Sequence, residues 1–176
     1  MSYGGWIEIN YEITRWEVKH RERVMKQRLI GIVVGSRSDL EVVKEASTLL
    51  DRFGIDYELV VSSAHRNPEG TKEYARGAGS RGLKLIIAAA GLSAALPGVI
   101  ASYTTLPVIG LPISAGPLAG LDSLCSMVQM PTGVPVATVG INNAKNAAIL
   151  AAEILALSDE TLRERLEEYR KELAEK

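Results

Sequence analysis

From Leu29 onward, short apolar runs alternate with longer stretches of helical periodicity, and this alternation limits the possible folds more than any other feature of the chain. Continuous apolar runs are typical of strands that are buried on both faces, as in a parallel sheet. Successive parallel strands need a crossover between them, which is usually a helix. The runs that predict strands cover residues 29–34, 57–62, 83–90, 107–113 and 134–140.

The stretches between these runs predict helices. In the first of them Leu40, Val43, Ala46 and Leu50 recur on one side, and Gly54 follows where the helix is expected to end. Strands that alternate with helices in a right-handed sense form an open, doubly wound parallel sheet with helices on both faces. The sequence therefore predicts the α/β class, with about five strands in a three-layer α/β/α sandwich. The remaining helices are expected at about 68–79, 96–104, 117–130 and 143–157.

The chain divides into three parts around this pattern. Residues 1–28 contain an alternation of apolar and polar residues that is typical of a half-buried strand, followed by a basic stretch. We interpret them as a poorly ordered N-terminal appendage, or as an over-long start with Met25 nearer the true beginning. The other two predicted parts are an α/β domain over 29–157 and a C-terminal helix over 158–176.

The two last helices raise the question of subunit contacts. The helix at 143–157 is rich in alanine on every side, which favours burial all round and therefore a contact between subunits. The C-terminal helix is expected to begin at Ser158, a residue type that favours the N-cap position. Its apolar stripe of Leu162, Leu166 and Leu173 fits either its own domain or that of a neighbour.

Composition and charge argue against several classes of function. The formal net charge is −1 and aromatic residues make up 5% of the chain, so neither nucleic-acid binding nor membrane-surface binding is expected. The sequence shows no export signal and no uninterrupted apolar span, and we therefore expect a cytoplasmic protein. The single cysteine, Cys125, excludes an intrachain disulfide and a CxxC-type metal site, and its apolar surroundings predict a small core residue.

Ligands of open parallel sheets bind at the carboxyl ends of the strands, so the loops that leave the strands are the candidate sites. The first loop reads "GSRSD" and joins a tight turn at Gly35 to a helix start, where free N–H groups favour an anion. Ser36 offers a hydroxyl to a phosphate or ribose oxygen. A structural interpretation stays open, because Ser38 and Glu41 fit a capping box, although it leaves Ser36 and Asp39 without a role.

The second loop, "SSAHRNP", carries the residue types of acid–base chemistry. His65 follows Ser62 and Ser63 at a strand end, and an imidazole with an ordinary pKa gives and takes a proton near neutral pH. Arg66 presents a forked donor that suits phosphate or carboxylate. A hydrogen-bonded structural histidine is the alternative. The adjacent arginine and the first loop at the same sheet edge favour a functional site.

The third and fourth loops are rich in small residues. The third, from Ala88 to Gly98, allows a flat ligand to approach its backbone, although dense helix–sheet packing explains the same composition equally well. The fourth contains Ser114, Gly116 and Gly120, which loosen it enough to close over a ligand.

Several motifs resemble, in order and spacing, the N5-carboxyaminoimidazole ribonucleotide mutase and aminoimidazole ribonucleotide carboxylase family of purine biosynthesis. The similarity covers about residues 29–157 and is most specific in "SAHR" and "SMVQMPTGVPVAT". The other segments that carry it are "GSRSD", "LPGVIA", "TLPVIGLPI" and "NAAILAAEIL". The resemblance implies a flavodoxin-like subunit in a homo-octamer, with active sites at subunit contacts.

The resemblance also implies roles for single residues. The family moves a carboxyl group from the exocyclic nitrogen of the ribonucleotide to C4 of its imidazole through carbon dioxide, and needs no metal, biotin, nucleoside triphosphate or other cofactor. His65 would be the general acid and base, and the loop at Ala90–Leu96 would shape the pocket for carbon dioxide and the ring. The implied substrate-binding residues are Ser36, Asp39 and Arg66, together with Gly35, Ser63, Gly91 and Leu96.

One departure from the family pattern bears on the choice between a mutase and a direct carboxylase. Mutases typically carry a second histidine in the third loop, in A-G-G-A-A-H-L-P-G, where this chain has Ala95 in "AGLSAALPG". That loop is closer to the branch that carboxylates aminoimidazole ribonucleotide directly with carbon dioxide. Arg66 and "VQMPTGVPVAT" are mutase-like, and we therefore expect the mutase. A direct carboxylase and a non-catalytic nucleotide-binding protein remain the alternatives.

Overall fold

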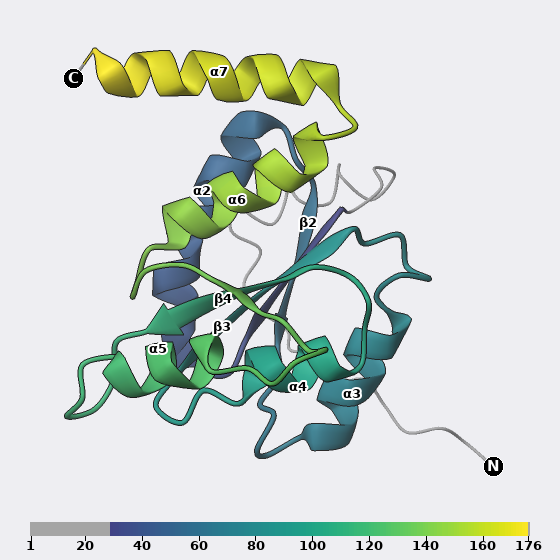
Figure 1. Cartoon of the computed structure of the whole chain (residues 1–176), viewed down its shortest axis with the longest axis vertical. Helices are drawn as coiled ribbons and strands as arrows, with labels where there is room; N and C mark the ends of the chain where they lie inside the picture. The colour runs from purple at the N-terminus through teal and green to yellow at the C-terminus, as the bar shows by residue number, and fades with distance from the viewer. Residues whose placement is uncertain (1–28, 176) are drawn as a thin grey trace, which may run out of the picture.

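The computed structural model describes residues 29–175 and shows one parallel sheet with helices on both faces (Figure 1). The observed strands and helices follow the predicted alternation closely. The strands are β1 (Ile30–Val34), β2 (Tyr57–Val61), β3 (Leu85–Gly91), β4 (Val108–Ile113) and β5 (Ala137–Thr138). The helices are the 3-10 turn η1 (Arg37–Asp39), α2 (Leu40–Phe53), α3 (Pro68–Gly77), α4 (Leu96–Ser102), α5 (Leu121–Val128), α6 (Ala144–Ala156) and α7 (Glu160–Ala174). The predictions for residues 1–28 lie outside the described residues.

The sheet has the strand order β2-β1-β3-β4-β5, and every neighbouring pair is parallel. This confirms the predicted flavodoxin-like, doubly wound α/β fold. The fifth strand is shorter than the predicted 134–140, because only Ala137 and Thr138 pair with β4. The chain leaves β1 toward β2 on one side and later returns to β3 on the other side. The carboxyl ends of β1 and β3 therefore form a topological switch point, where ligands of such sheets bind.

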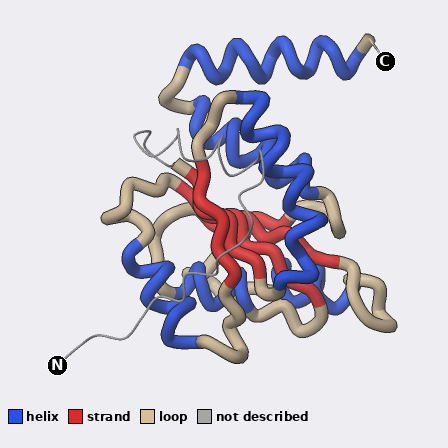
Figure 2. The backbone as a smooth tube through the Cα atoms, turned by 180° about the vertical axis from the view of Figure 1, so that it is seen from behind, coloured by secondary structure: helices blue, strands red, loops and turns tan. Residues whose placement is uncertain are grey.

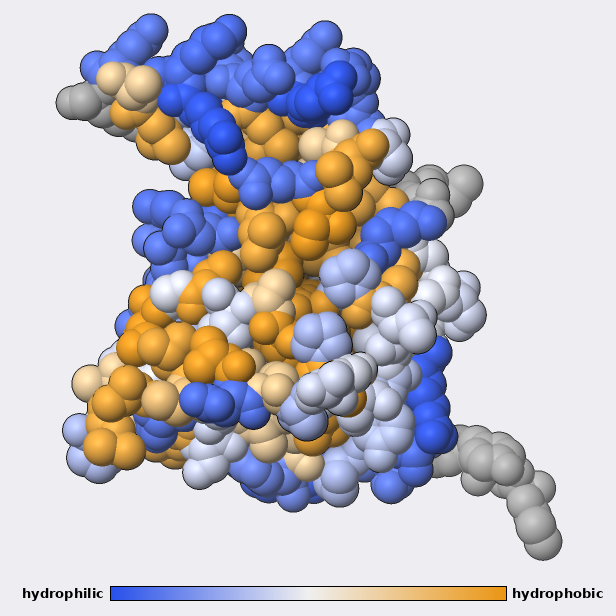
Figure 3. Space-filling view, in the orientation of Figure 1, coloured by the Kyte–Doolittle hydropathy of each residue, from blue (hydrophilic) through white to orange (hydrophobic). Residues whose placement is uncertain are grey.

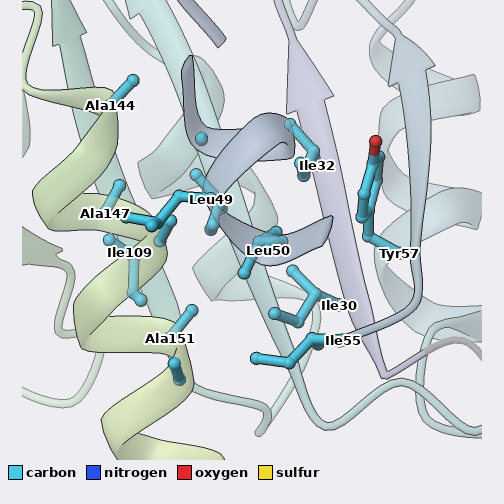
Figure 4. Close-up of a cluster of buried hydrophobic side chains, with 14 of the residues drawn as sticks. Ile30, Ile32, Leu49, Leu50, Ile55, Tyr57, Ile109, Ala144, Ala147 and Ala151 are labelled. Carbon is cyan, nitrogen blue, oxygen red and sulfur yellow. The ribbon is translucent and has the colours of Figure 1, made fainter. Parts of the chain in front are cut away.

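The three central strands, β1, β3 and β4, send alternate side chains into two separate cores. Ile30, Ile32 and Val34 of β1 pack on the side of α2 and α6, while Val33 packs on the side of α3, α4 and α5. Figure 2 shows the sheet between these two helical layers, and Figure 4 shows the α2–α6 side. Burial of both faces explains why these three strands read as continuous apolar runs.

The alanine-rich helix α6 is buried by its own chain. Ala147, Ala148 and Ala151 are fully buried and belong to the same core as Leu50 of α2. Figure 4 shows Ala147 and Ala151 directed toward Leu49 and Leu50. Small side chains allow α2 and α6 to approach closely, so the alanines are explained within the subunit. A subunit contact through this helix stays a prediction.

Helix α7 lies against its own domain through part of the predicted stripe. Leu162 and Leu166 are buried in the α2–α6 core, whereas Leu173 is 48% exposed. The predicted cap at Ser158 is wrong by one residue, because Asp159 is the N-cap and its carboxylate accepts from the backbone N–H of Leu162. Across residues 29–175, no helix is both long and apolar enough to span a bilayer.

The prediction that Cys125 is a core residue was wrong. Cys125 is exposed, whereas Ser123 and Met127 of the same helix, α5, are buried. Leu121 and Val128 share this exposure, at 57% and 53%. The apolar pattern of α5 therefore reflects two different faces, one packed on the sheet and one open.

Candidate active site

Three loops meet in a cleft at the carboxyl edge of the sheet. The loops follow β1, β2 and β3, and the cavity between them has a volume of about 480 Å³. All eight residues predicted for the site line it: Gly35, Ser36, Asp39, Ser63, His65, Arg66, Gly91 and Leu96. The structure therefore brings the predicted residues together, as expected of strand ends that share one edge.

The first loop is organised by hydroxyl groups. Ser36 is the N-cap of η1, and its Oγ accepts from the backbone N–H of Ser38 at 3.4 Å. The hydroxyl of Ser38 lies 2.9 Å from Ser36 Oγ and 3.1 Å from Asp39 Oδ1. The predicted capping box of Ser38 and Glu41 is absent, since a 3-10 turn precedes α2 and Ser38 bonds within that turn. Ser36 consequently has a structural role that the sequence did not reveal.

Asp39 is a buried carboxyl group at the floor of this loop. Its exposed fraction is 8%. Burial raises the pKa of Asp39 above its ordinary value, while hydrogen bonds from Ser38 and from the backbone of Ser36 act in the opposite direction. The protonated form is thus relatively more favourable in the folded protein than in the unfolded chain.

This shift gives a prediction for stability against pH. A raised folded-state pKa contributes stability that is fully present below the unfolded pKa and is lost as the pH rises through the folded pKa. Asp39→Asn removes the buried charge, so we expect the Tm to rise at pH 7 by up to about 3 °C and the gain to shrink in acid. Scanning calorimetry at several pH values measures this.

Glu41→Gln is the matched control, because the Glu41 side chain is 84% exposed. It should leave the Tm nearly unchanged across the same pH range. A lower Tm for Asp39→Asn at pH 7 would contradict the prediction and show that the carboxylate stabilises the folded state.

The second loop places His65 and Arg66 at the rim of the cleft. Both side chains are exposed. The Oγ of Ser63 accepts from the backbone N–H of Arg66 at 3.3 Å and from its Nε at 3.4 Å. Ser63 thereby directs the guanidinium group while its terminal nitrogens stay available. The loop offers one group that can exchange a proton and one fixed cation.

The third loop forms the small-residue wall of the cleft. Ala94 and Leu96 are buried, and Gly91 is held close to the next loop, since a Cβ there would lie 3.1 Å from the Cβ of Ala115. Leu92 adopts a left-handed conformation with φ of 53°, which is uncommon for a residue other than glycine, and its side chain is 52% exposed. Ala95 also lines the cavity, at the position where mutases typically carry histidine.

The fourth loop contributes less than predicted. Ala115 is its one residue on the cleft wall in the described part of the chain. Gly116 packs against Leu92, with a hypothetical Cβ 2.7 Å from Leu92 Cδ2. Gly120 has φ of 92° at the start of α5, and Ser114 donates its backbone N–H to Asn142 Oδ1, so both have structural roles. These contacts fix the position of the fourth loop at several points.

Comparisons with known proteins agree with this geometry. A sequence profile of the AIR carboxylase family matches residues 29–176. The chain belongs to the AIR carboxylase family. It is similar to an N5-carboxyaminoimidazole ribonucleotide mutase of Pyrococcus horikoshii, with 55% identity over 148 residues that cover 84% of each chain.

Two further proteins are similar to this AIR carboxylase family member. A phosphoribosylaminoimidazole carboxylase of Schizosaccharomyces pombe is 53% identical over 141 residues, which cover 80% of this chain and 26% of that protein. The crystal structure of Treponema denticola PurE superposes with a TM-score of 0.77 at 32% identity, over 84% of this chain and 92% of the other. The predicted family resemblance is confirmed.

Sequence reasoning missed some residues of this AIR carboxylase cleft. Ser38 was given a capping role, Ala115 was not named, and Leu92 was included only as part of the loop from Ala90 to Leu96. All three line the cavity. The left-handed conformation of Leu92 leaves no signal in the sequence, because leucine does not favour it. Among residues 29–175, no group of three or more His, Cys, Asp or Glu side chains is arranged to hold a metal ion.

Proposed function

We propose that this chain is an N5-carboxyaminoimidazole ribonucleotide mutase, which forms 4-carboxy-5-aminoimidazole ribonucleotide in de novo purine biosynthesis. The observation that carries the proposal is the cleft that gathers His65, Arg66 and the first loop in a chain of the AIR carboxylase family. The relative from Pyrococcus horikoshii, which bears the mutase name, is 55% identical to this chain.

The proposed reaction moves one carboxyl group and exchanges two protons. The bond from the exocyclic nitrogen to the carboxyl carbon breaks, carbon dioxide is released, and the nitrogen gains a proton. C4 of the ring then attacks the carbon dioxide and loses its own proton. His65 acts as the acid in the first step and as the base in the second, so it returns to its starting state. The net change is an isomerisation, and no redox or hydrolytic cofactor enters the balance.

The remaining residues hold the substrate in this proposal. Ser36, Asp39 and Arg66 bind the ribonucleotide, with the guanidinium group of Arg66 on an anionic oxygen. The small loop from Ala90 to Leu96, with Gly91, keeps the carbon dioxide near the ring. Gly35 and Ser63 are further residues that contact the substrate in this proposal. We assign catalysis to the domain of residues 29–157 and a supporting role to the helix of 158–176.

A direct phosphoribosylaminoimidazole carboxylase is the second candidate. Ala95, in place of the second histidine of mutases, favours it, and the relative from Schizosaccharomyces pombe bears that name. Purified protein is assayed with N5-carboxyaminoimidazole ribonucleotide and, separately, with aminoimidazole ribonucleotide plus bicarbonate. Turnover of the first substrate supports the mutase, and turnover of only the second pair supports the carboxylase. Turnover of neither supports a non-catalytic nucleotide-binding protein.

We further propose that the protein is cytoplasmic and assembles as a homo-octamer. The support for an oligomer is an exposed apolar area formed by α5 and the loop before it, where Leu118 and Leu121 are each 57% exposed and Val128 is 53% exposed. Figure 3 shows apolar surface gathered at the position of α5 and between α6 and α7. Monomeric proteins seldom leave large apolar areas open to water. Light scattering on the purified protein measures the mass that tests the octamer.

A further inference from the structure

The loop that carries His65 is closed at its base by two buried hydroxyl groups. Ser62 directly follows β2 and is 7% exposed, while Thr71 lies in α3 and is fully buried. Their oxygens are 2.8 Å apart. Neither side chain lines the cleft. Buried hydroxyls that bond to each other join two elements of the fold at a defined distance.

The direction of these hydrogen bonds follows from their partners. The hydroxyl of Thr71 donates to the carbonyl oxygen of Asn67 at 3.0 Å, so its one hydrogen is used. The hydroxyl of Ser62 therefore donates to Thr71 Oγ1. The resulting chain of bonds connects residues 62 and 67, which are the two ends of the loop.

Backbone contacts fix the same two ends. The N–H of Ser62 donates to the carbonyl of Val34 in β1, and the N–H of Asn67 donates to the carbonyl of Ser63. The Asn67 side chain caps α3 by accepting from the N–H of Gly70 at 3.1 Å. The two hydroxyls thus complete a clamp between the sheet edge and the first turn of α3.

The imidazole of His65 depends on this backbone for its position. The side chain is exposed, and among the described residues it makes no hydrogen bond and no ion pair. Its location is consequently set by the course of the loop from Ser62 to Asn67. A catalytic group must be held within a fraction of an ångström of its working geometry.

We propose that Thr71 and Ser62 are positioning residues for His65, which they hold at the cleft by clamping the base of its loop. The proposal rests on the proposed catalytic role of His65. It assigns a function in the reaction to two residues that touch no part of the cleft.

Thr71→Val tests the clamp, because valine keeps the shape of threonine and removes the hydroxyl. At a temperature well below the Tm of every variant, we expect the kcat to fall about 10-fold, since a small misplacement of a reacting group lowers the rate steeply. Thr71→Ser keeps the hydroxyl and should restore the kcat to within about 2-fold of the original. Ser62→Ala removes the other hydroxyl and should lower the kcat in the same way.

Thr48→Val is the matched control. Thr48 makes the same kind of bond as Thr71, from its hydroxyl to the carbonyl of Lys44 four residues earlier at 2.9 Å, but on the exposed side of α2. Its kcat should be unchanged. If Thr71→Val and Ser62→Ala turn over as fast as Thr48→Val, the proposal is overturned, whatever their effect on the Tm.

A second measurement separates this proposal from the proposed function. The chain has two histidines, so the ring signals of His65 are assigned in NMR spectra by their loss in His65→Asn. Thr71→Val should shift or broaden the His65 signals, and Thr71→Ser should leave them in place. Unchanged His65 signals in Thr71→Val overturn the clamp. Absence of turnover in the unmodified protein contradicts the proposed function instead, and the NMR result still stands.

Discussion

His65→Asn is expected to lower the kcat at least ~100-fold while the protein folds normally and binds the ribonucleotide with nearly unchanged affinity. Asparagine cannot exchange a proton near neutral pH, so both proton transfers lose their acid and base. The side chain is exposed at the rim of the cleft, and its replacement removes no core contact. The kcat, the Kd for the ribonucleotide and the Tm are measured on the same preparation.

His20→Asn is the control for this variant, since it replaces the other histidine of the chain, outside residues 29–176 that match the family. It should leave the kcat unchanged. A His65→Asn protein with a near-normal kcat would end the catalytic assignment. A variant with a strongly lowered Tm would instead show that the imidazole has a structural role.

The sheet was predictable because its three central strands, β1, β3 and β4, are buried on both faces and therefore read as apolar runs. The predicted strand bounds were less accurate where a strand is not buried on both faces. At 134–140 most residues are not paired with β4, and only Ala137 and Thr138 form β5. The helix at 117–130 is shorter than predicted for a related reason, since Leu118 lies in an exposed loop before Leu121 begins α5. In this segment the apolar residues Leu118 and Leu121 lie on the solvent-exposed surface and not in the core.

The site was predictable in its location and less so in its detail. Parallel strands end at one edge, and this alone brings His65 into the same cleft as Ser36 and Asp39. The exchange of roles between Ser36 and Ser38 depends on a single 3-10 turn, which a pattern of residue types does not define. The bond between Ser62 and Thr71 joins residues nine positions apart through tertiary packing, and it also leaves no local pattern.

Arg66→Ala is expected to raise the KM for the ribonucleotide about 30-fold or more and to change the kcat less than about 3-fold. The reason is that the variant loses a charge-assisted hydrogen bond that the substrate makes equally in the ground state and in the transition state. The Nε of Arg66 bonds to Ser63, which leaves the terminal nitrogens for an anionic oxygen. Arg37→Ala removes an exposed cation of the first loop that does not line the cleft, and it should change the KM little. Steady-state kinetics at two salt concentrations distinguish a direct contact from long-range attraction, since the latter is screened by salt. Equal KM values for the two variants would show that the anionic group of the substrate is held by other residues.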